Sequence, residues 1–427
     1  MTARLRAADV LPLVAAASIP LVFLHAMYQW HGKIGPADVY GSDVAILLVV
    51  ISAIAAGVLF GWEPLERGRP LWIPAGALLA VFVISSFWRP LELPTKHLVT
   101  AAKSIEYALL APAIVLLFRR RVDVDRFLYV FVAWAVAAAG WGVLMFFAIV
   151  DDPEGPRPGQ REVSFLGHQD LGGFTGAALA LGFAAIALRT RHRLAAVAVV
   201  AGSLGVIIDA SVFAYLGTIL AAIAAAWIGR RVGTMTLRRS LAMAGILLVV
   251  GSGVYVLRGS DVSNYLSFLG ITASKSSPED VQTGSQRALL LWIGWKIFED
   301  HPNLGVGFQR SGNRYQPYLA EAKRKFSGQP PQAFPSPAHP WGVQNFWVQL
   351  LADTGIVGFA LGVATFVTGL VMALRRARGP SFYALVAAGF ILVAAGTWNA
   401  IGIVAGIPLD AVMWLGFGLT VVALEVS

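Results

Sequence analysis

Residues 241–257 read LAMAGILLVVGSGVYVL, an uncharged apolar run that ends abruptly at Arg258. A helix needs about 20 predominantly apolar residues to cross the hydrocarbon core of a bilayer, so a run of this kind predicts a membrane span. The stretch that follows, residues 258–343, is polar by comparison and carries nine Lys or Arg and six Asp or Glu. The contrast between these two neighbouring segments determines how the rest of the chain is interpreted.

Apolar runs of the same kind occur along the whole chain. Hydrophobic residues make up 57% of the 427 positions and charged residues only 13%, with a mean hydropathy of +0.68, a composition typical of a polytopic membrane protein. We therefore expect an all-α fold with about twelve transmembrane helices. The expected spans cover residues 9–30, 43–62, 70–88, 98–118, 124–150, 170–188, 194–209, 212–228, 241–257, 345–374, 382–399 and 406–426.

The basic residues predict the orientation of these spans. If the N-terminus is cytoplasmic, 18 of the 33 Lys and Arg fall in short cytoplasmic segments, as the positive-inside rule requires. Both termini are then cytoplasmic, and residues 258–343 form a large outer loop between the ninth and tenth spans. The net charge of +9 follows this distribution, so we expect no nucleic-acid partner. We divide the chain into a nine-helix region (1–257), the loop region (258–343) and a three-helix region (344–427), integrated into one domain.

The outer loop has its own expected elements. TGSQRALLLWIGWKIFED (283–300) predicts one amphipathic helix, too short to span and lying along the membrane surface. PPQAFPSPAHP (330–340) contains five prolines and therefore predicts an extended segment. A helix begins at NFWVQLLADTGIVGFALG (345–362), with a bend expected near Asp353 and Gly355.

Arg287 on the short helix is followed by HPNLGVGF (301–308) and then by QNFWVQLLADTGIVGF (344–359). This arrangement resembles the O-antigen ligase and polymerase superfamily of bacterial envelope glycosyltransferases, over about residues 160–360. In that family the helix after the loop opens with a His-Asn or similar pair, then nine residues and G-x-x-G. Asn345, Gly355 and Gly358 keep this spacing, whereas Gln344 stands where the family has histidine.

The resemblance implies a metal-independent enzyme without a cofactor. It moves a glycan from an undecaprenyl-pyrophosphate carrier to a sugar hydroxyl, on lipid A core or on another growing glycan chain, for lipopolysaccharide or a related surface polysaccharide. The implied location is the bacterial inner membrane, in contact with membrane lipids, with the active face periplasmic. Ligase and polymerase share the donor, so both readings stay open. A transporter or flippase of lipid-linked glycans, which binds the same donor without breaking a bond, is the alternative from another class.

The family's chemistry requires cations near the leaving pyrophosphate, and arginine grips phosphate oxygens in pairs. Arg287, at the start of the short helix, is our first phosphate-binding candidate. Arg161, in RPGQREVSFLGHQDLGGFTG (157–176), is the second, because the family carries another arginine in an earlier outer turn. A lipid-headgroup contact or a structural salt bridge is the alternative for both arginines.

The acceptor hydroxyl must also lose its proton to a base, and glutamine does not titrate. His339 is our candidate base, because the PWGV turn (340–343) can return its ring to the helix start. His168 is the second candidate, and His301 is expected only to shape a turn with Pro302. Gln344, Asn345 and Trp341 are expected to orient substrate. The alternatives are a helix N-cap for Asn345 and an interfacial anchor for Trp341.

Four further charges fall in or near expected spans. We expect Lys103 and Glu106 to pair across one helical turn inside the bundle, because isolated charges in lipid are costly. Asp353 and Asp410 lie near expected outer helix ends, where we interpret them as solvated caps.

Overall fold

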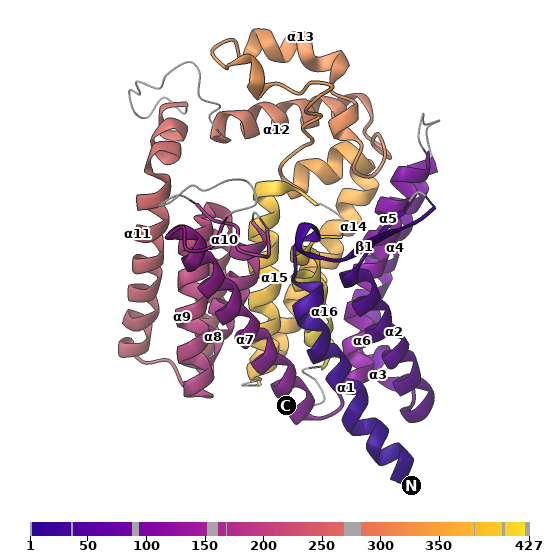
Figure 1. The fold of residues 1–427 in the computed structure, drawn as a ribbon, viewed down its shortest axis with the longest axis vertical. Helices are drawn as coiled ribbons and strands as arrows, with labels where there is room; N and C mark the ends of the chain where they lie inside the picture. Colours follow the sequence, from indigo (N-terminus) through magenta and orange to yellow (C-terminus); the bar gives the residue numbers. More distant parts are fainter. Residues whose placement is uncertain are drawn as a thin grey trace.

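The computed structural model describes residues 2–35, 37–87, 94–151, 161–167, 169–268, 283–379, 381–403 and 406–422, and these form a bundle of long helices (Figure 1). Ten helices are long and apolar enough to cross a membrane, and two apolar helices, residues 7–22 and 408–422, are shorter. The bundle helices are α1 (Thr2–Val22), α2 (Gly41–Phe60), α4 (Arg69–Phe87), α5 (Pro94–Ala108), α6 (Leu110–Leu117), α7 (Arg121–Phe146), α8 (Asp170–Leu188), α9 (His192–Asp209), α10 (Val212–Arg231), α11 (Leu237–Phe268), α14 (Phe346–Ala377), α15 (Phe382–Ile401) and α16 (Pro408–Val422).

Each of the twelve expected segments corresponds to a helix in this set, with α5 and α6 together forming the fourth, so the expected all-α polytopic fold is confirmed. The break between α5 and α6 lies at Leu109. Pro112 follows three residues later, in the first turn of α6, where proline is favoured because the N–H groups of that turn have no partner within the helix.

The helices α8 and α15 form the centre of the bundle: 94% and 78% of the residues in their apolar 18-residue stretches are buried. In α11 only 17% of these residues are buried, so this helix lies on the periphery. Glycines let α8 approach its neighbours closely. A side chain at Gly176 would meet Val393 of α15 and Thr218 of α10, and one at Gly172 would collide with Asp209 of α9. Small residues of this kind are the usual means by which membrane helices pack tightly.

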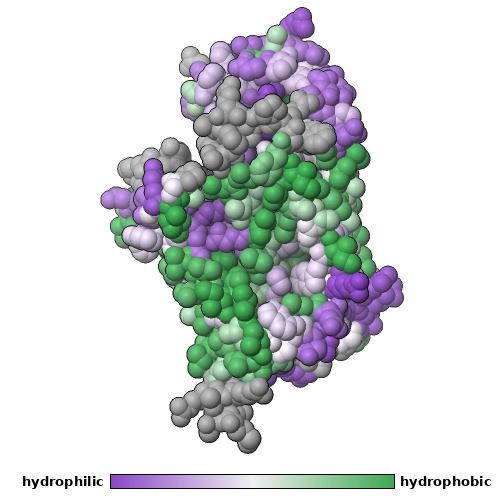
Figure 2. Space-filling model, turned by 90° about the vertical axis from the view of Figure 1, so that its right-hand side faces the viewer, coloured by the Kyte–Doolittle hydropathy of each residue, from purple (hydrophilic) through white to green (hydrophobic). Residues whose placement is uncertain are grey.

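Two further helices, α12 (Thr283–Asp300) and α13 (Gln316–Lys325), lie across one end of the bundle (Figure 1). The start of α1 and the end of α16 lie at the opposite end. A separate hydrophobic cluster, which includes Leu290, Ile293 and Ile297 of α12 and Tyr318 and Ala322 of α13, holds this layer together. Figure 2 shows hydrophilic side chains over this layer and hydrophobic ones over the bundle beneath it.

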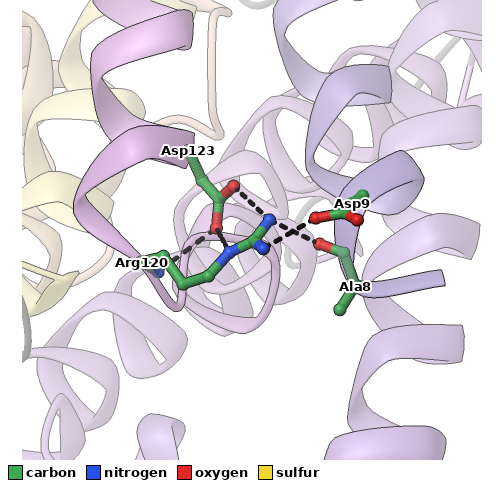
Figure 3. A network of polar contacts seen from close by, with 4 residues as sticks. All are labelled: Ala8, Asp9, Arg120 and Asp123. Carbon is green, nitrogen blue, oxygen red and sulfur yellow. Dashed lines mark hydrogen bonds and ion pairs between the residues drawn. The ribbon is translucent and has the colours of Figure 1, made fainter. Parts of the chain in front are cut away.

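At the end where α1 begins, Arg120 joins the N-terminus of α7 to α1 (Figure 3). Its guanidinium donates to the Asp9 carboxylate at 2.7 Å, to the Ala8 carbonyl at 2.9 Å and to the buried Asp123 carboxylate at 2.9 Å. These acceptors, Asp123 foremost, raise the pKa of Arg120 above its ordinary value. The network therefore fixes α1 against α7 through a guanidinium that stays charged.

Three features differ from the expectations or add to them. The helix of the ninth span does not stop at residue 257 but continues to Phe268, with a kink at Arg258 where the outer segment was expected to begin. Residues 31–40 form a small antiparallel hairpin of β1 (His31–Ile34) and β2 (Ala37–Tyr40). The remaining short elements are α3 (Glu63–Glu66) and the 3-10 turns Ala26–Tyr28, Ser311–Asn313 and Pro331–Ala333. The last of these is the only helical turn described within the proline-rich segment 330–340.

Candidate active site

An open pocket of about 350 Å³ lies beneath the layer of α12 and α13. This size falls in the range of ordinary ligand sites, about 300–1,000 Å³. Its lining comes from α5, from the segments that flank α13, from the start of α14 and from the end of α15. The lining residues are His97, Thr100, Gln309, Ser311, Gly312, Asn313, Pro340, Gly342, Val343, Gln344, Gln349, Ile401 and Ile403.

One wall of the pocket is a loop held on α14 by backbone hydrogen bonds; residues 302–311 are called the clamped loop below. The N–H of Val306 donates to Ala352 O at 3.0 Å, that of Gly307 to Asp353 O at 2.7 Å, and that of Ile356 to Pro302 O at 2.8 Å. These bonds require the helix to open at Gly355, where φ is 64° and ψ is −164°. The bend expected near Asp353 and Gly355 is thus confirmed, and its role is to receive the loop.

The Asp353 carboxylate fixes the end of the clamped loop. It accepts the N–H of Gln309 at 3.0 Å and the N–H of Ser311 at 2.9 Å, and the residue is 1% exposed. Asp410 is 3% exposed and accepts the N–H of Gly406 at 3.1 Å. The interpretation of both as solvated caps is therefore wrong: both are buried, and each accepts backbone N–H groups that the sequence alone does not place.

The floor of the pocket is formed where α15 ends. The side-chain amides of Gln309 and Gln349 both donate to the Ile403 carbonyl, at 2.9 and 3.0 Å, and Ile403 N–H returns a bond to the Gln349 oxygen at 2.6 Å. These two glutamines are used to join the clamped loop, α14 and the end of α15. They shape the pocket and are not directed to a ligand.

The structure brings Arg287 and Gln344 together. Nε of Arg287 lies 3.5 Å from Oε1 of Gln344, and the guanidinium lies 5.6 Å from the ring centroid of Phe213, at the start of α10. Both side chains are half-buried, and Gln344 lines the pocket. The guanidinium of Arg287 thus lies at the edge of the pocket. Its helix, α12, packs its apolar face against α13.

Arg161 forms the structural salt bridge that the sequence left open as an alternative. Its guanidinium donates to the carbonyl and the buried carboxylate of Asp209, the latter at 3.1 Å, so it forms a structural ion pair at the end of α9. Phe213, which Arg287 covers, lies only four residues further along the chain. The two arginines therefore flank the same α9–α10 turn, where Arg161 is paired with the Asp209 carboxylate.

Asn345 serves as the N-cap of α14. Its Oδ1 accepts the N–H groups of Trp347 and Val348, both at 3.1 Å, and its Nδ2 donates to Asn399 of α15 at 2.8 Å. Asn345 therefore caps the helix, which is the alternative that the sequence left open for it, and the same side chain joins α14 to α15 beside the pocket.

The segment that carries His339 forms an exposed turn; residues 336–341 are called the proline turn below. The ring of His339 stacks on Trp341 at a centroid distance of 5.7 Å, and both side chains are exposed. Backbone bonds between Ser336 and His339, at 3.0 and 3.1 Å, close the turn on itself. Pro340 lines the pocket, whereas His339 faces Trp341. His168, the second candidate base, lies outside the described residues. His301 closes a turn as expected, its carbonyl accepting the N–H of Gly305.

Two residues of α5, His97 and Thr100, line the pocket and were missed in the sequence. The available signal was a histidine at the outer start of an expected span, the same signal that pointed to His168. Deeper in α5, Lys103 forms its ion pair with Asp43 of α2 and lies 3.9 Å from Glu106. The expected pairing with Glu106 is therefore present, but a residue on another helix is the closer partner.

A second, apolar pocket of about 40 Å³ lies in the bundle between α4, α5, α14, α15 and α16. Ile403 lines both pockets, and Phe346 and Trp398, stacked at a centroid distance of 4.9 Å, line the apolar one. The remaining lining is mostly apolar: Leu78, Leu79, Phe82, Gly362, Thr365, Phe366, Met413, Trp414 and Phe417, with Ser104 and Asp410. Within the described ranges, no three His, Asp or Glu residues lie close enough together to hold a metal ion.

Comparison with known proteins is informative for one part of the chain. A family model described as O-antigen ligase matches residues 177–363. None of the curated proteins matches the chain. The matched range begins in α8, contains Arg287, the clamped loop and Gln344, and ends in α14; it leaves out α5 and α15, which supply the rest of the pocket.

Proposed function

We propose that this protein transfers a glycan from an undecaprenyl-pyrophosphate carrier to a sugar hydroxyl, because a family model described as O-antigen ligase matches residues 177–363. The transfer takes place at the periplasmic face of the bacterial inner membrane, in the assembly of lipopolysaccharide or a related surface polysaccharide. The family supports a membrane glycosyltransferase of the ligase or polymerase kind, and the donor and direction of transfer are our inference.

The observation that supports this proposal is that Ile403 lines both a polar pocket and a smaller apolar pocket inside the bundle. A polyprenyl-linked glycan has this same division into a polar head and a hydrocarbon tail. In our proposal the sugar and pyrophosphate occupy the pocket beneath the outer layer, and the tail enters the bundle along Phe346 and Trp398.

Arg287 is the residue that binds the pyrophosphate in this proposal. As the glycosidic bond breaks, negative charge grows on the leaving pyrophosphate, and a fixed cation beside it stabilises the transition state. The planar guanidinium can donate two parallel bonds to phosphate oxygens. Arg161, whose charge Asp209 offsets, contributes by holding the α9–α10 turn under Phe213 and so by placing the surface on which Arg287 rests.

Gln344 and Asn345 orient the reacting groups from the start of α14. Gln344 contacts Arg287 and lines the pocket, so its amide can bind a sugar hydroxyl while its oxygen keeps the guanidinium in place. Asn345 fixes this end of the helix by capping it and by bonding to Asn399. Trp341, at the exposed rim, offers a ring on which a sugar of the acceptor can stack.

The direct test uses the purified full-length protein with an undecaprenyl-pyrophosphate-linked oligosaccharide. Two acceptors are supplied separately: lipopolysaccharide lacking O-antigen, and the donor oligosaccharide alone. Mass analysis that finds the glycan on lipid A core supports a ligase, and a lengthened lipid-linked glycan supports a polymerase. Tight donor binding without transfer to either acceptor would instead support a transporter and reject the enzyme.

A further inference from the structure

Gln344 has no side chain that titrates near neutral pH, but a histidine, His97, lines the same pocket. We propose that His97 of α5 is the general base that accepts the proton of the acceptor hydroxyl, an inference that rests on the proposed glycan transfer. His97 and Gln344 line the same pocket of about 350 Å³, although they are far apart in the sequence.

The chemistry of the step requires such a group. The acceptor oxygen forms a bond to the anomeric carbon, and the bond from that carbon to the pyrophosphate oxygen breaks with its electron pair going to the pyrophosphate. The hydroxyl proton passes to the imidazole of His97 and from there to water, so the carrier pyrophosphate leaves as an anion. Imidazole is suited to this because its ordinary pKa, about 6.5, lies near neutral pH.

The pocket lining identifies His97 by comparison with its neighbours. Among the described residues that form the lining, the others are amides, hydroxyls, glycines, a proline and aliphatic side chains, none of which titrates near neutral pH. The amides of Gln309 and Gln349 are bonded to Ile403. His97 is thus the group within this lining that can take up a proton.

The helix that carries His97 gives it a fixed position. Thr100, one turn further along α5, lines the same pocket, so this face of α5 is directed to it. α5 packs against α4, α16 and α2 and continues into α6, which is buried in the bundle. His339, by comparison, stacks on Trp341 in the exposed proline turn. A base on α5 is therefore held more firmly than one on the proline turn.

The location of His97 also divides the reaction between two parts of the chain. Arg287 and Gln344 lie within the O-antigen ligase match, whereas His97 precedes it by eighty residues. In our proposal the matched part binds the leaving group, and α5 supplies the proton acceptor to the same pocket.

The test compares His97→Gln, Gln344→His and the double variant in the full-length protein. The donor is the undecaprenyl-pyrophosphate-linked oligosaccharide, and donor binding and single-turnover transfer are measured separately. We expect His97→Gln to lower the transfer rate by about 10²-fold or more while donor affinity changes less than twofold. Adding Gln344→His to His97→Gln places an imidazole at another position of the same pocket and should restore the rate at least tenfold.

Two further variants complete the test. His192→Gln, an exposed histidine at the start of α9, is the matched control and should transfer at the wild-type rate. The inference is overturned if His97→Gln transfers normally, if it loses rate only together with donor binding, if the double variant is not restored, or if the loss appears in His339→Gln instead. Failure of the wild-type protein to transfer glycan would reject the proposed function itself, a result visible before any variant is made.

Discussion

The clamped loop and the proline turn lie on the same pocket but are held in different ways. The clamped loop is fixed on α14 by four backbone hydrogen bonds and by the buried Asp353 carboxylate. The proline turn is closed by bonds between its own residues and exposes both His339 and Trp341. A segment bonded to a second element keeps its geometry when substrate arrives, whereas a segment bonded only to itself can adapt. We therefore expect the clamped loop to hold its pocket residues in a fixed geometry and the proline turn to change conformation when substrate binds.

The largest effect is expected when the clamped loop is detached from α14. Gly355→Ala puts a side chain where φ is 64° and ψ is −164°, a conformation open almost only to glycine, at a cost of about 1–3 kcal/mol. The new Cβ would also collide with the carbonyl of Asn303. We expect transfer to fall more than 100-fold, with the loop becoming sensitive to limited proteolysis.

The matched control for this change is Gly245→Ala in α11, where an added Cβ meets nothing within 4 Å. It should leave both thermal unfolding and transfer unchanged. If Gly355→Ala behaves like Gly245→Ala, the backbone bonds to the loop are not what shapes the pocket.

The second effect concerns charge at the pocket edge. Arg287→Ala removes the guanidinium beside Gln344, and charged hydrogen bonds of about 1.5–3 kcal/mol each predict at least a tenfold loss of transfer. Arg287→Lys should recover only part of it, because an ammonium lacks the planar fork. Circular dichroism and thermal unfolding check that the protein remains folded. Arg324→Ala on the exposed face of α13 is the control, and an equal loss there would mean that only net charge matters.

The fold follows closely from the sequence because spans are determined by local composition. The short helix at 283–300 has the expected bounds, and the bend near Gly355 lies where a glycine follows an acidic residue inside an apolar helix. Continuation of α11 to Phe268 was missed because the onset of charge at Arg258 marks the end of apolar composition and not the end of the helix. The hairpin at 31–40 was missed because four-residue strands are too short for a clear alternation.

The site follows less closely, because its residues meet only through tertiary contacts. Arg287 and Gln344 could be singled out by their order in the chain, and the structure places them in contact. Nothing local indicates that Arg161 meets Asp209, forty-eight residues later, or that His97 lines the pocket that Gln344 lines. The expectation that His339 returns over α14 depended on how a short proline-rich turn folds, and stacking on Trp341 determines its ring position in the structure.

An intermediate effect is expected when the clamped loop stays attached but loses its carboxylate. Asp353→Asn leaves one carbonyl oxygen to accept the N–H groups of Gln309 and Ser311, so one buried donor loses its partner, at a cost of about 1–3 kcal/mol. We expect a lower thermal unfolding temperature and a transfer rate reduced three- to tenfold, because Ser311 and its neighbours line the pocket. The control is Asp300→Asn, which changes an exposed carboxylate that accepts a hydrogen bond from Tyr318. An equal loss of rate in this variant would mean that the effect of Asp353→Asn does not depend on the pocket.

The smallest effect is expected in the proline turn. Trp341 is 37% exposed, and its ring contact among the described residues is with the exposed His339, so Trp341→Ala should leave thermal unfolding unchanged. If the ring binds a sugar of the acceptor, its removal raises the KM for acceptor about three- to tenfold, since stacking of an aromatic ring is worth about 0.5–1.5 kcal/mol, while kcat stays within twofold. Trp295→Ala on α12, a tryptophan that is 46% exposed and does not line the pocket, controls for the loss of an exposed ring. A fall in kcat for Trp341→Ala would mean that the proline turn, like the clamped loop, must keep one geometry for transfer. The distinction between an adaptable and a fixed part of the site would then be wrong.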